Sequence, residues 1–180
     1  MANISCTGHR STAATTSGIW RFTAVVHYSE PELIYRKPDS SIIDSAMYEE
    51  KGKFYLFVKS SPNPDNLLLL VSDHVNGKFE RVEGFDDSMG AQTKGMYEAP
   101  TAVKLADGRW CLFADFYGAG CAGQGYVPFV SDDLTKGVFT RADEAFHFPY
   151  GFKHGTILPI TEEEYERMLA RDWTDVPDLR

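Results

Sequence analysis

Two acidic residues, Asp44 and Glu98, stand at matching places in two similar stretches of this 180-residue sequence. Asp44 follows Ser-Ile-Ile and precedes a turn and an apolar run, and Glu98 stands in Met-Tyr-Glu-Ala-Pro-Thr one unit later. A lone carboxylate of this kind can belong to an edge strand or to the surface, because an unpaired buried charge is costly. The repeated placement favours a shared role. Two carboxylates that converge on one bond can act as acid and base.

An internal repeat frames both acidic residues. The segment Gly-Lys-Phe-Tyr-Leu-Phe at Gly52 matches Gly-Arg-Trp-Cys-Leu-Phe at Gly108, 56 residues later. A Ser-Asp turn followed by Gly-x-Phe begins at Ser72 and again at Ser131. A recurring four-stranded unit of about 50–60 residues is typical of propeller blades. Partial units begin near Tyr28 and Phe152, and two similar hairpins in a sandwich are the alternative.

Short apolar runs bounded by turn residues predict that strands dominate the chain. The strands are expected at Lys53–Lys59, Leu67–Ser72, Thr101–Leu105, Arg109–Phe116 and Tyr126–Ser131. One helix is expected, at Glu162–Arg171, where Thr161 precedes three glutamates that suit a helix N-terminus.

These patterns predict an all-β protein, an incomplete five-bladed β-propeller with three to four blades and one short C-terminal helix. In a propeller the innermost strands line a central funnel, so polar residues near their starts meet in one pocket. We expect residues 1–20 to be disordered or irregular and residues 21–180 to form the partial propeller domain.

The charge and cysteine content narrows the classes of partner. The formal net charge is −8 and the pI is about 5.1, which disfavours nucleic acid and anionic membranes. Three cysteines without a Cys-x-x-Cys pair argue against a disulfide framework or a structural zinc site. No stretch is typical of a membrane span or a signal peptide, and secreted, periplasmic and cytoplasmic locations all stay open.

From about Trp20 to about Arg171 the sequence resembles glycoside hydrolase family 43 and its relatives, the arabinanase- and xylosidase-like five-bladed propellers. The resemblance rests on five short motifs in the expected order. They are Ser29-Glu30-Pro31-Glu32-Leu33-Ile34-Tyr35 leading into Ile43-Asp44-Ser45, then Glu98-Ala99-Pro100, Ser131-Asp132-Asp133-Leu134, Lys153-His154-Gly155-Thr156, and Ile160-Thr161 with Glu164-Tyr165.

The resemblance implies a role for each matched polar residue. Glu98 corresponds to the general acid, which must carry a proton for the leaving oxygen. Asp44 corresponds to a second carboxylate that tunes and orients this acid. His154 corresponds to a central histidine that binds a water or a calcium ion, and a structural histidine is the alternative. Further substrate-binding candidates that line the cleft are Asp115, Tyr117 and Lys59.

The implied activity is hydrolysis of pentose-containing polysaccharide or oligosaccharide, of the arabinan or xylan type, by an inverting acid–base mechanism. A carbohydrate substrate is the expected partner. The resemblance requires no cofactor and allows calcium at His154.

Two departures from the family pattern modify this expectation. Ala99 stands where the family often has glycine. The general base of the family is an aspartate upstream of Asp44, whereas residues 1–20 do not resemble a blade and Asp39 sits in a Lys-Pro-Asp-Ser turn. We therefore expect a truncated member with weak or no hydrolysis by itself. The alternative is a non-catalytic carbohydrate-binding or vestigial fragment that covers its open blade edges by forming a homo-oligomer.

Overall fold

The computed structural model describes residues 13–16, 19–22, 32–62, 64–92, 96–118, 125–146, 151 and 153–171, with side chains from residue 32 onward. Several sequence predictions concern residues outside these ranges. They include the unit starts near Tyr28 and Phe152 and the cysteines Cys6 and Cys121. The described residues after Phe152 run without a strand as far as the final helix.

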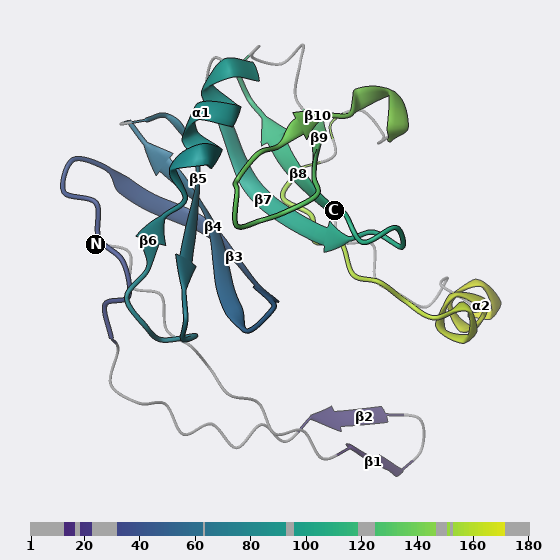
Figure 1. The fold of residues 1–180 in the computed structure, drawn as a ribbon. Coiled ribbons are helices and arrows are strands. Elements are labelled where there is room, and N and C mark those ends of the chain that lie inside the picture. Colours follow the sequence, from purple (N-terminus) through teal and green to yellow (C-terminus); the bar gives the residue numbers. More distant parts are fainter. Residues whose placement is uncertain are drawn as a thin grey trace.

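Most strands of the described chain belong to two antiparallel four-stranded sheets (Figure 1). The first has the order β3-β4-β5-β6 and consists of Ser41–Glu50, Lys53–Ser61, Asn66–Ser72 and Glu80–Arg81. The second has the order β10-β9-β8-β7, and in chain order its strands are Tyr97–Lys104, Trp110–Phe116, Gly125–Ser131 and Thr140–Arg141. Each sheet is a simple meander whose last strand is short. This repetition confirms the prediction of a partial β-propeller, and the two sheets are two of its blades.

A separate hairpin precedes the blades. Strands β1 (Ala13–Thr16) and β2 (Ile19–Phe22) pair only with each other. Figure 1 shows this hairpin apart from the two sheets. The division of the chain at residue 20 stays a prediction.

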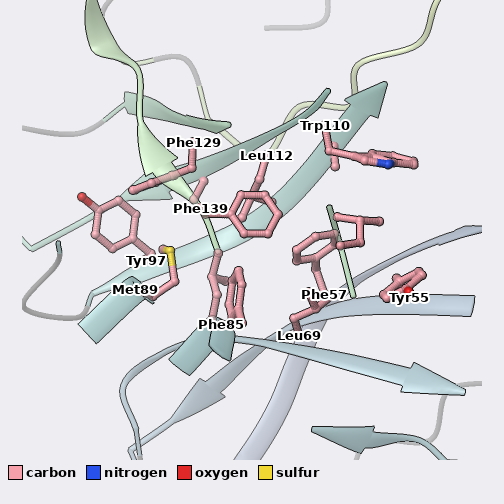
Figure 2. Close-up of a cluster of buried hydrophobic side chains, with 14 of the residues drawn as sticks. Tyr55, Phe57, Leu69, Phe85, Met89, Tyr97, Trp110, Leu112, Phe129 and Phe139 are labelled. Atoms are coloured by element: carbon pink, nitrogen blue, oxygen red, sulfur yellow. The ribbon is translucent and has the colours of Figure 1, made fainter. Parts of the chain in front are cut away.

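The main hydrophobic core lies between the two blades (Figure 2). Phe57 of β4, Phe85 and Phe139 meet edge to face, with ring centroids 5.3 to 6.0 Å apart. Such ring pairs each add about 0.5–1.5 kcal/mol beyond the burial of their area. Tyr48 of β3 also accepts a hydrogen bond of 2.6 Å from the backbone N–H of Ala102 in β7. The two blades are therefore joined by apolar packing and by direct hydrogen bonding.

The far faces of the two blades carry smaller apolar clusters. On the first blade this cluster includes Leu56, Val58, Leu68 and Leu70, and on the second it centres on Phe113. Because β4, β5 and β8 are buried on both faces, their sequences are continuous apolar runs without alternation. This explains why these strands are readable from sequence.

Helix α1 (Glu83–Gln92) was not predicted. Its sequence contains two glycines and two aspartates, which are poor helix formers, so local preference argues against it. Tertiary contacts hold it instead. Phe85 and Met89 are buried, and Ser88 Oγ both donates to the carbonyl of Phe139 (2.7 Å) and accepts from its N–H (2.9 Å). Gly84 lies so close to the Lys136 carbonyl that a Cβ there would be 2.1 Å from its oxygen.

Helix α2 (Glu162–Ala170) confirms the predicted C-terminal helix. Thr161 and Glu164 form a reciprocal capping box, in which Glu164 N–H donates to Thr161 Oγ1 (3.2 Å) and Thr161 N–H donates to Glu164 Oε2 (2.8 Å). All nine helical residues are exposed. Within the described ranges, no helix is long and apolar enough to span a membrane.

Candidate functional site

The inner strands of the two blades carry the same β-bulge near their starts. In β3 the pairing with β4 shifts between Ile43 and Ala46, so that Asp44 and the residue after it oppose a single partner. In β7 the shift lies between Glu98 and Thr101. A bulge of this kind kinks the strand and redirects its side chains. The inner strands β3 and β7 are therefore both kinked near their first residues, on the sides where Asp44 and Ala99 meet.

The bulges correct the sequence-based alignment of the two acidic residues. Asp44 has φ of 50° and Ala99 has φ of 46°, which makes them equivalent first residues of the two bulges. Glu98 pairs with β8 in the position that Ile43 holds against β4. Asp44 and Glu98 are thus offset by one position, because Asp44 is the first residue of its bulge whereas Glu98 is the residue before its own.

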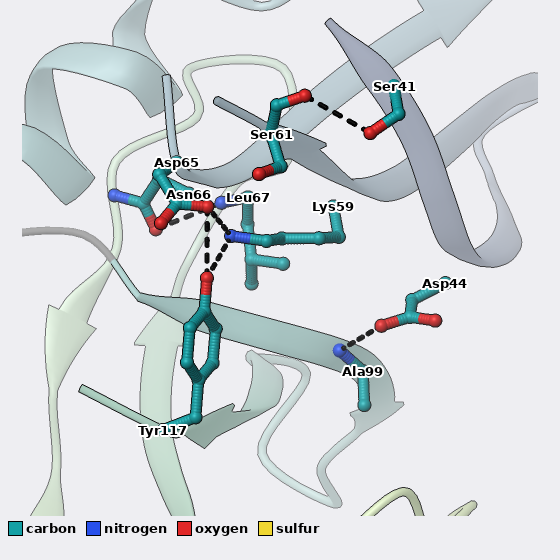
Figure 3. A network of polar contacts seen from close by, with 9 residues as sticks. All are labelled: Ser41, Asp44, Lys59, Ser61, Asp65, Asn66, Leu67, Ala99 and Tyr117. Carbon is teal, nitrogen blue, oxygen red and sulfur yellow. Dashed lines mark hydrogen bonds and ion pairs between the residues drawn. The ribbon is translucent and has the colours of Figure 1, made fainter. Parts of the chain in front are cut away.

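This offset brings Asp44 into contact with the other blade (Figure 3). The backbone N–H of Ala99 donates a hydrogen bond of 3.1 Å to Asp44 Oδ2. Asp44 therefore lies against the residue that follows Glu98. The two predicted catalytic carboxylates, which are 54 positions apart in the chain, belong to one region of the structure.

Glu98 itself contacts the loop that precedes α2. Glu98 Oε1 lies 3.3 Å from Nε2 of His154, and the Glu98 side chain is 22% exposed. Two hydrogen bonds hold this loop on the second blade, from Tyr126 Oη to the Gly155 carbonyl (2.7 Å) and from the Ile157 N–H to Thr101 Oγ1 (3.3 Å). The position of His154 is therefore set by the blade that carries Glu98.

Asp115 lies directly behind these two groups. It is the cross-strand partner of Glu98 in β8, and its Oδ2 is 3.9 Å from His154 Nε2. Its side chain is 0% exposed, and neither carboxylate oxygen has a hydrogen-bond partner among the described residues. Burial raises the pKa of Asp115, while the positive charges of Lys153 and His154 and the nearby backbone N–H of His154, which does not reach normal hydrogen-bond geometry, oppose that rise.

A small pocket lies beside these groups. It has a volume of about 160 Å³ and is lined by Asp44, Ser45, Ala99, Pro100, His154 and Gly155. Three of the residues that line it have left-handed backbone conformations that non-glycine residues rarely adopt, namely Asp44, Ala99 and His154. Backbone strain of this kind costs about 1–3 kcal/mol per residue and concentrates at functional sites. The strain and the pocket coincide, which supports this region as the candidate site.

Two larger hollows are less suited to chemistry. They have volumes of about 320 Å³ and about 280 Å³ and occupy equivalent Ser-Asp turns of the two blades. In each of them one of the lining basic residues is paired with an aspartate, Arg109 with Asp107 and Lys53 with Asp73, and no cluster of a histidine with two carboxylates is present among the described lining residues. We therefore place the candidate site at the smaller pocket, which Asp44 and His154 line and beside which Glu98 and Asp115 lie against His154.

Lys59 and Tyr117 form a network of their own between the blades (Figure 3). Lys59 Nζ donates to Asp65 Oδ1 and to Tyr117 Oη, both at 2.6 Å, and Tyr117 Oη donates to Asp65 Oδ1 at 2.9 Å. The Lys59 side chain is only 3% exposed, so its charge is neutralised inside the protein. The hydrogen bond from Lys59 is the main reason that the pKa of Asp65 is lowered.

The family comparison fits this geometry. A family model described as a probable glycosyl hydrolase domain, related to glycoside hydrolase family 43, matches residues 4–166. The chain belongs to this family. Among curated proteins, no sequence matches the chain. Membership in the family confirms the resemblance that the motifs indicated and a glycoside hydrolase-like function for the domain.

For this glycosyl hydrolase domain, the structure brings four of the six predicted site residues together: Asp44, Glu98, Asp115 and His154. Lys59 and Tyr117 lie in the separate network with Asp65. Asp65 was missed, because the Pro-Asn-Pro-Asp sequence around it predicts only a turn. The roles of all six in binding or catalysis stay predictions.

Proposed function

We propose that this chain provides the acid side of a glycosidase site, with Glu98 as the general acid. The carrying observation is that Glu98, partly exposed beside a small pocket, lies next to the point where Asp44 reaches across from the other blade. A general acid needs access to the leaving oxygen and a fixed orientation. Partial exposure supplies the access, and the contacts around Glu98 supply the orientation.

Asp44 is the proposed orienting carboxylate. Its acceptance of the Ala99 N–H fixes the bulge that directly follows Glu98. A carboxylate already used in this way is a poor candidate for the base that activates water. Asp115 is fully buried and equally unsuited to that role.

The proposed substrates are arabinan- or xylan-type polysaccharides and their oligosaccharides, cleaved with inversion. Inversion requires a base carboxylate roughly 6.5–9.5 Å from the acid, on the other side of the sugar. In the described ranges the site carboxylates are Glu98, the proposed acid, and Asp44 and Asp115, which are both unsuited to act as the base. We therefore expect slow turnover by this chain alone.

The test compares aryl arabinofuranosides and aryl xylosides with good and poor leaving groups. Glu98→Gln is expected to reduce turnover of the poor leaving group by about 10²–10⁴-fold. It should affect the good leaving group less, because that group departs without a proton. The control is Glu49→Gln, an exposed glutamate on β3, which should behave as wild type. Unchanged turnover of both substrates in Glu98→Gln would remove the acid assignment.

A second candidate function is carbohydrate binding without turnover. It is favoured by the same observation that Asp44 and Asp115 are engaged or buried, which leaves no described site carboxylate free to act as base. Oligosaccharide binding in calorimetry, with no product after long incubation, supports this candidate over hydrolysis. Failure to bind any glycan contradicts both.

A further inference from the structure

Three atoms that can bind a metal ion meet at the bulge of β7. One carboxylate oxygen each from Glu98 and Asp115 and one ring nitrogen of His154 lie within 4.8 Å of one another. His154 Nε2 is 3.3 Å from Glu98 Oε1 and 3.9 Å from Asp115 Oδ2. Two atoms bound tetrahedrally to one zinc ion, each at about 2.0–2.2 Å, are about 3.4 Å apart. Small side-chain movements would therefore suffice to place all three around one ion.

The state of Asp115 points independently to a missing ligand. Its carboxylate is completely buried and lacks any hydrogen bond of normal geometry among the described residues. An ionised carboxylate in that situation is strongly unfavourable, because an isolated buried charge has lost its hydration and gained no partner in return. Its Oδ2 is directed into the same space as His154 Nε2. A cation in that space would supply the missing partner.

The chemistry of the donors selects the kind of cation. Calcium and magnesium prefer shells made of oxygen atoms, with about six to eight ligands for calcium. An imidazole nitrogen suits first-row transition ions, and one nitrogen with two carboxylates leaves an open position. The cluster therefore fits zinc better than the calcium that the family resemblance allows.

We propose that Glu98, Asp115 and His154 form a binding site for a divalent first-row transition ion, best fitted by Zn²⁺, and that the bound ion blocks the acid function of Glu98. The second half rests on the proposed function. A carboxylate that binds a metal is deprotonated. Glu98 in that state has no proton to give to a leaving oxygen, so zinc is an inhibitor of hydrolysis.

Calorimetric titration of the metal-free full chain with Zn²⁺ tests the binding site directly. We expect one site that is at least about 100-fold weaker in His154→Gln, because the only nitrogen ligand is removed. His154 is 53% exposed, so this variant should fold normally. The matched control is His74→Gln, which changes an exposed histidine on a turn of the first blade and should leave binding unchanged. Equal binding by the two variants overturns the proposal.

A second measurement covers the buried ligand. Co²⁺ used in place of Zn²⁺ gives visible absorption bands that depend on its ligands, and Asp115→Asn should change these bands. Thermal unfolding of Asp115→Asn without metal establishes whether the variant is folded. Identical Co²⁺ spectra for folded Asp115→Asn and wild type overturn the assignment of Asp115. Binding of Ca²⁺ but not Zn²⁺ overturns the choice of ion.

Hydrolysis assays with and without Zn²⁺ distinguish failure of the metal-site proposal from failure of the glycosidase proposal. Zinc binding by a wild-type chain that hydrolyses nothing supports the metal site and contradicts the glycosidase. Hydrolysis that saturating Zn²⁺ does not reduce supports the glycosidase and contradicts the block. Inhibition by Zn²⁺ that a chelator reverses supports both.

Discussion

Ala99 has a left-handed backbone at the first position of the bulge in β7, where its N–H bonds to Asp44. The family often has glycine at this place, and glycine adopts such a conformation without steric cost. The methyl group of Ala99 therefore introduces strain beside the proposed acid. This strain is a property of one residue and can be tested by one substitution.

We expect Ala99→Gly to stabilise the fold by up to about 1 kcal/mol, since relief of strain exceeds the loss of one methyl group. The control is Ala102→Gly in the same strand, where φ is not left-handed, and that change should destabilise by about 0.5–1 kcal/mol. Denaturant unfolding of both variants provides the measurement. A destabilised Ala99→Gly would contradict the strain argument.

Asp65 gives a prediction for stability against pH. The Lys59 hydrogen bond lowers the folded-state pKa of Asp65 below its unfolded value. The contribution is therefore complete above the unfolded carboxyl pKa of about 3.9 and is lost as pH falls through the lower folded value. Wild type should lose more stability than Asp65→Asn between about pH 5 and about pH 2.

Denaturant midpoints at a series of pH values measure this difference. Asp73→Asn is the comparison, because Asp73 also pairs with a lysine but is 73% exposed. Salt should weaken the Asp73 pair and leave the buried Lys59 pair largely unaffected. Parallel pH curves for wild type and Asp65→Asn would refute the link between this network and acid stability.

At the scale of elements, sequence and structure agree where a strand is buried on both faces. The predicted strand Lys53–Lys59 became β4, and Leu67–Ser72 became β5, because apolar runs bounded by turn residues have few other solutions. Helix α1 could not be predicted in the same way. Its formation depends on contacts with Lys136 and Phe139, about 50 positions later in the chain, which local preference does not register.

Helix α1 is thus expected to depend on its anchor to the second blade. Ser88→Ala removes the acceptor of the buried Phe139 N–H and should destabilise the protein by about 1–3 kcal/mol. Gln92 still donates to the Phe139 carbonyl, which limits the loss. Asp87→Ala, at an exposed position of the same helix, should have little effect. Denaturant unfolding measures both, and equal values for the two variants would contradict the anchor.

The whole molecule should unfold as one unit, because the largest core is shared by both blades. Phe57→Ala is expected to cost about 3–5 kcal/mol, since the ring is fully buried and packs against Phe85 and Phe139. Amide hydrogen exchange should show equal losses of protection in β5 and in β8, although only the first blade is changed. Loss confined to β5 would show that the blades unfold separately.

The sequence indicated which residues belong to the candidate site, but not their strand register or their burial. The repeat indicated that Asp44 and Glu98 lie at blade starts, and the family motifs indicated His154. The one-residue offset between the acidic positions depends on where the bulge falls in each strand, which the matched motifs do not fix. The burial of Asp115 could not be predicted from the sequence either, because an aspartate in an apolar strand usually lies on an edge strand or at the protein surface.

The repeated bulge also places one buried charged residue at an equivalent position in each blade. Lys59 and Asp115 occupy the same rung, each opposite the residue before the bulge, and both are buried. Lys59 donates hydrogen bonds to Asp65 and Tyr117, whereas the Asp115 carboxylate accepts no hydrogen bond of normal geometry from the described residues. In the first blade this backbone position therefore helps to hold the two blades together, through the hydrogen bond from Lys59 to Tyr117, and in the second it offers a ligand group, through the carboxylate of Asp115.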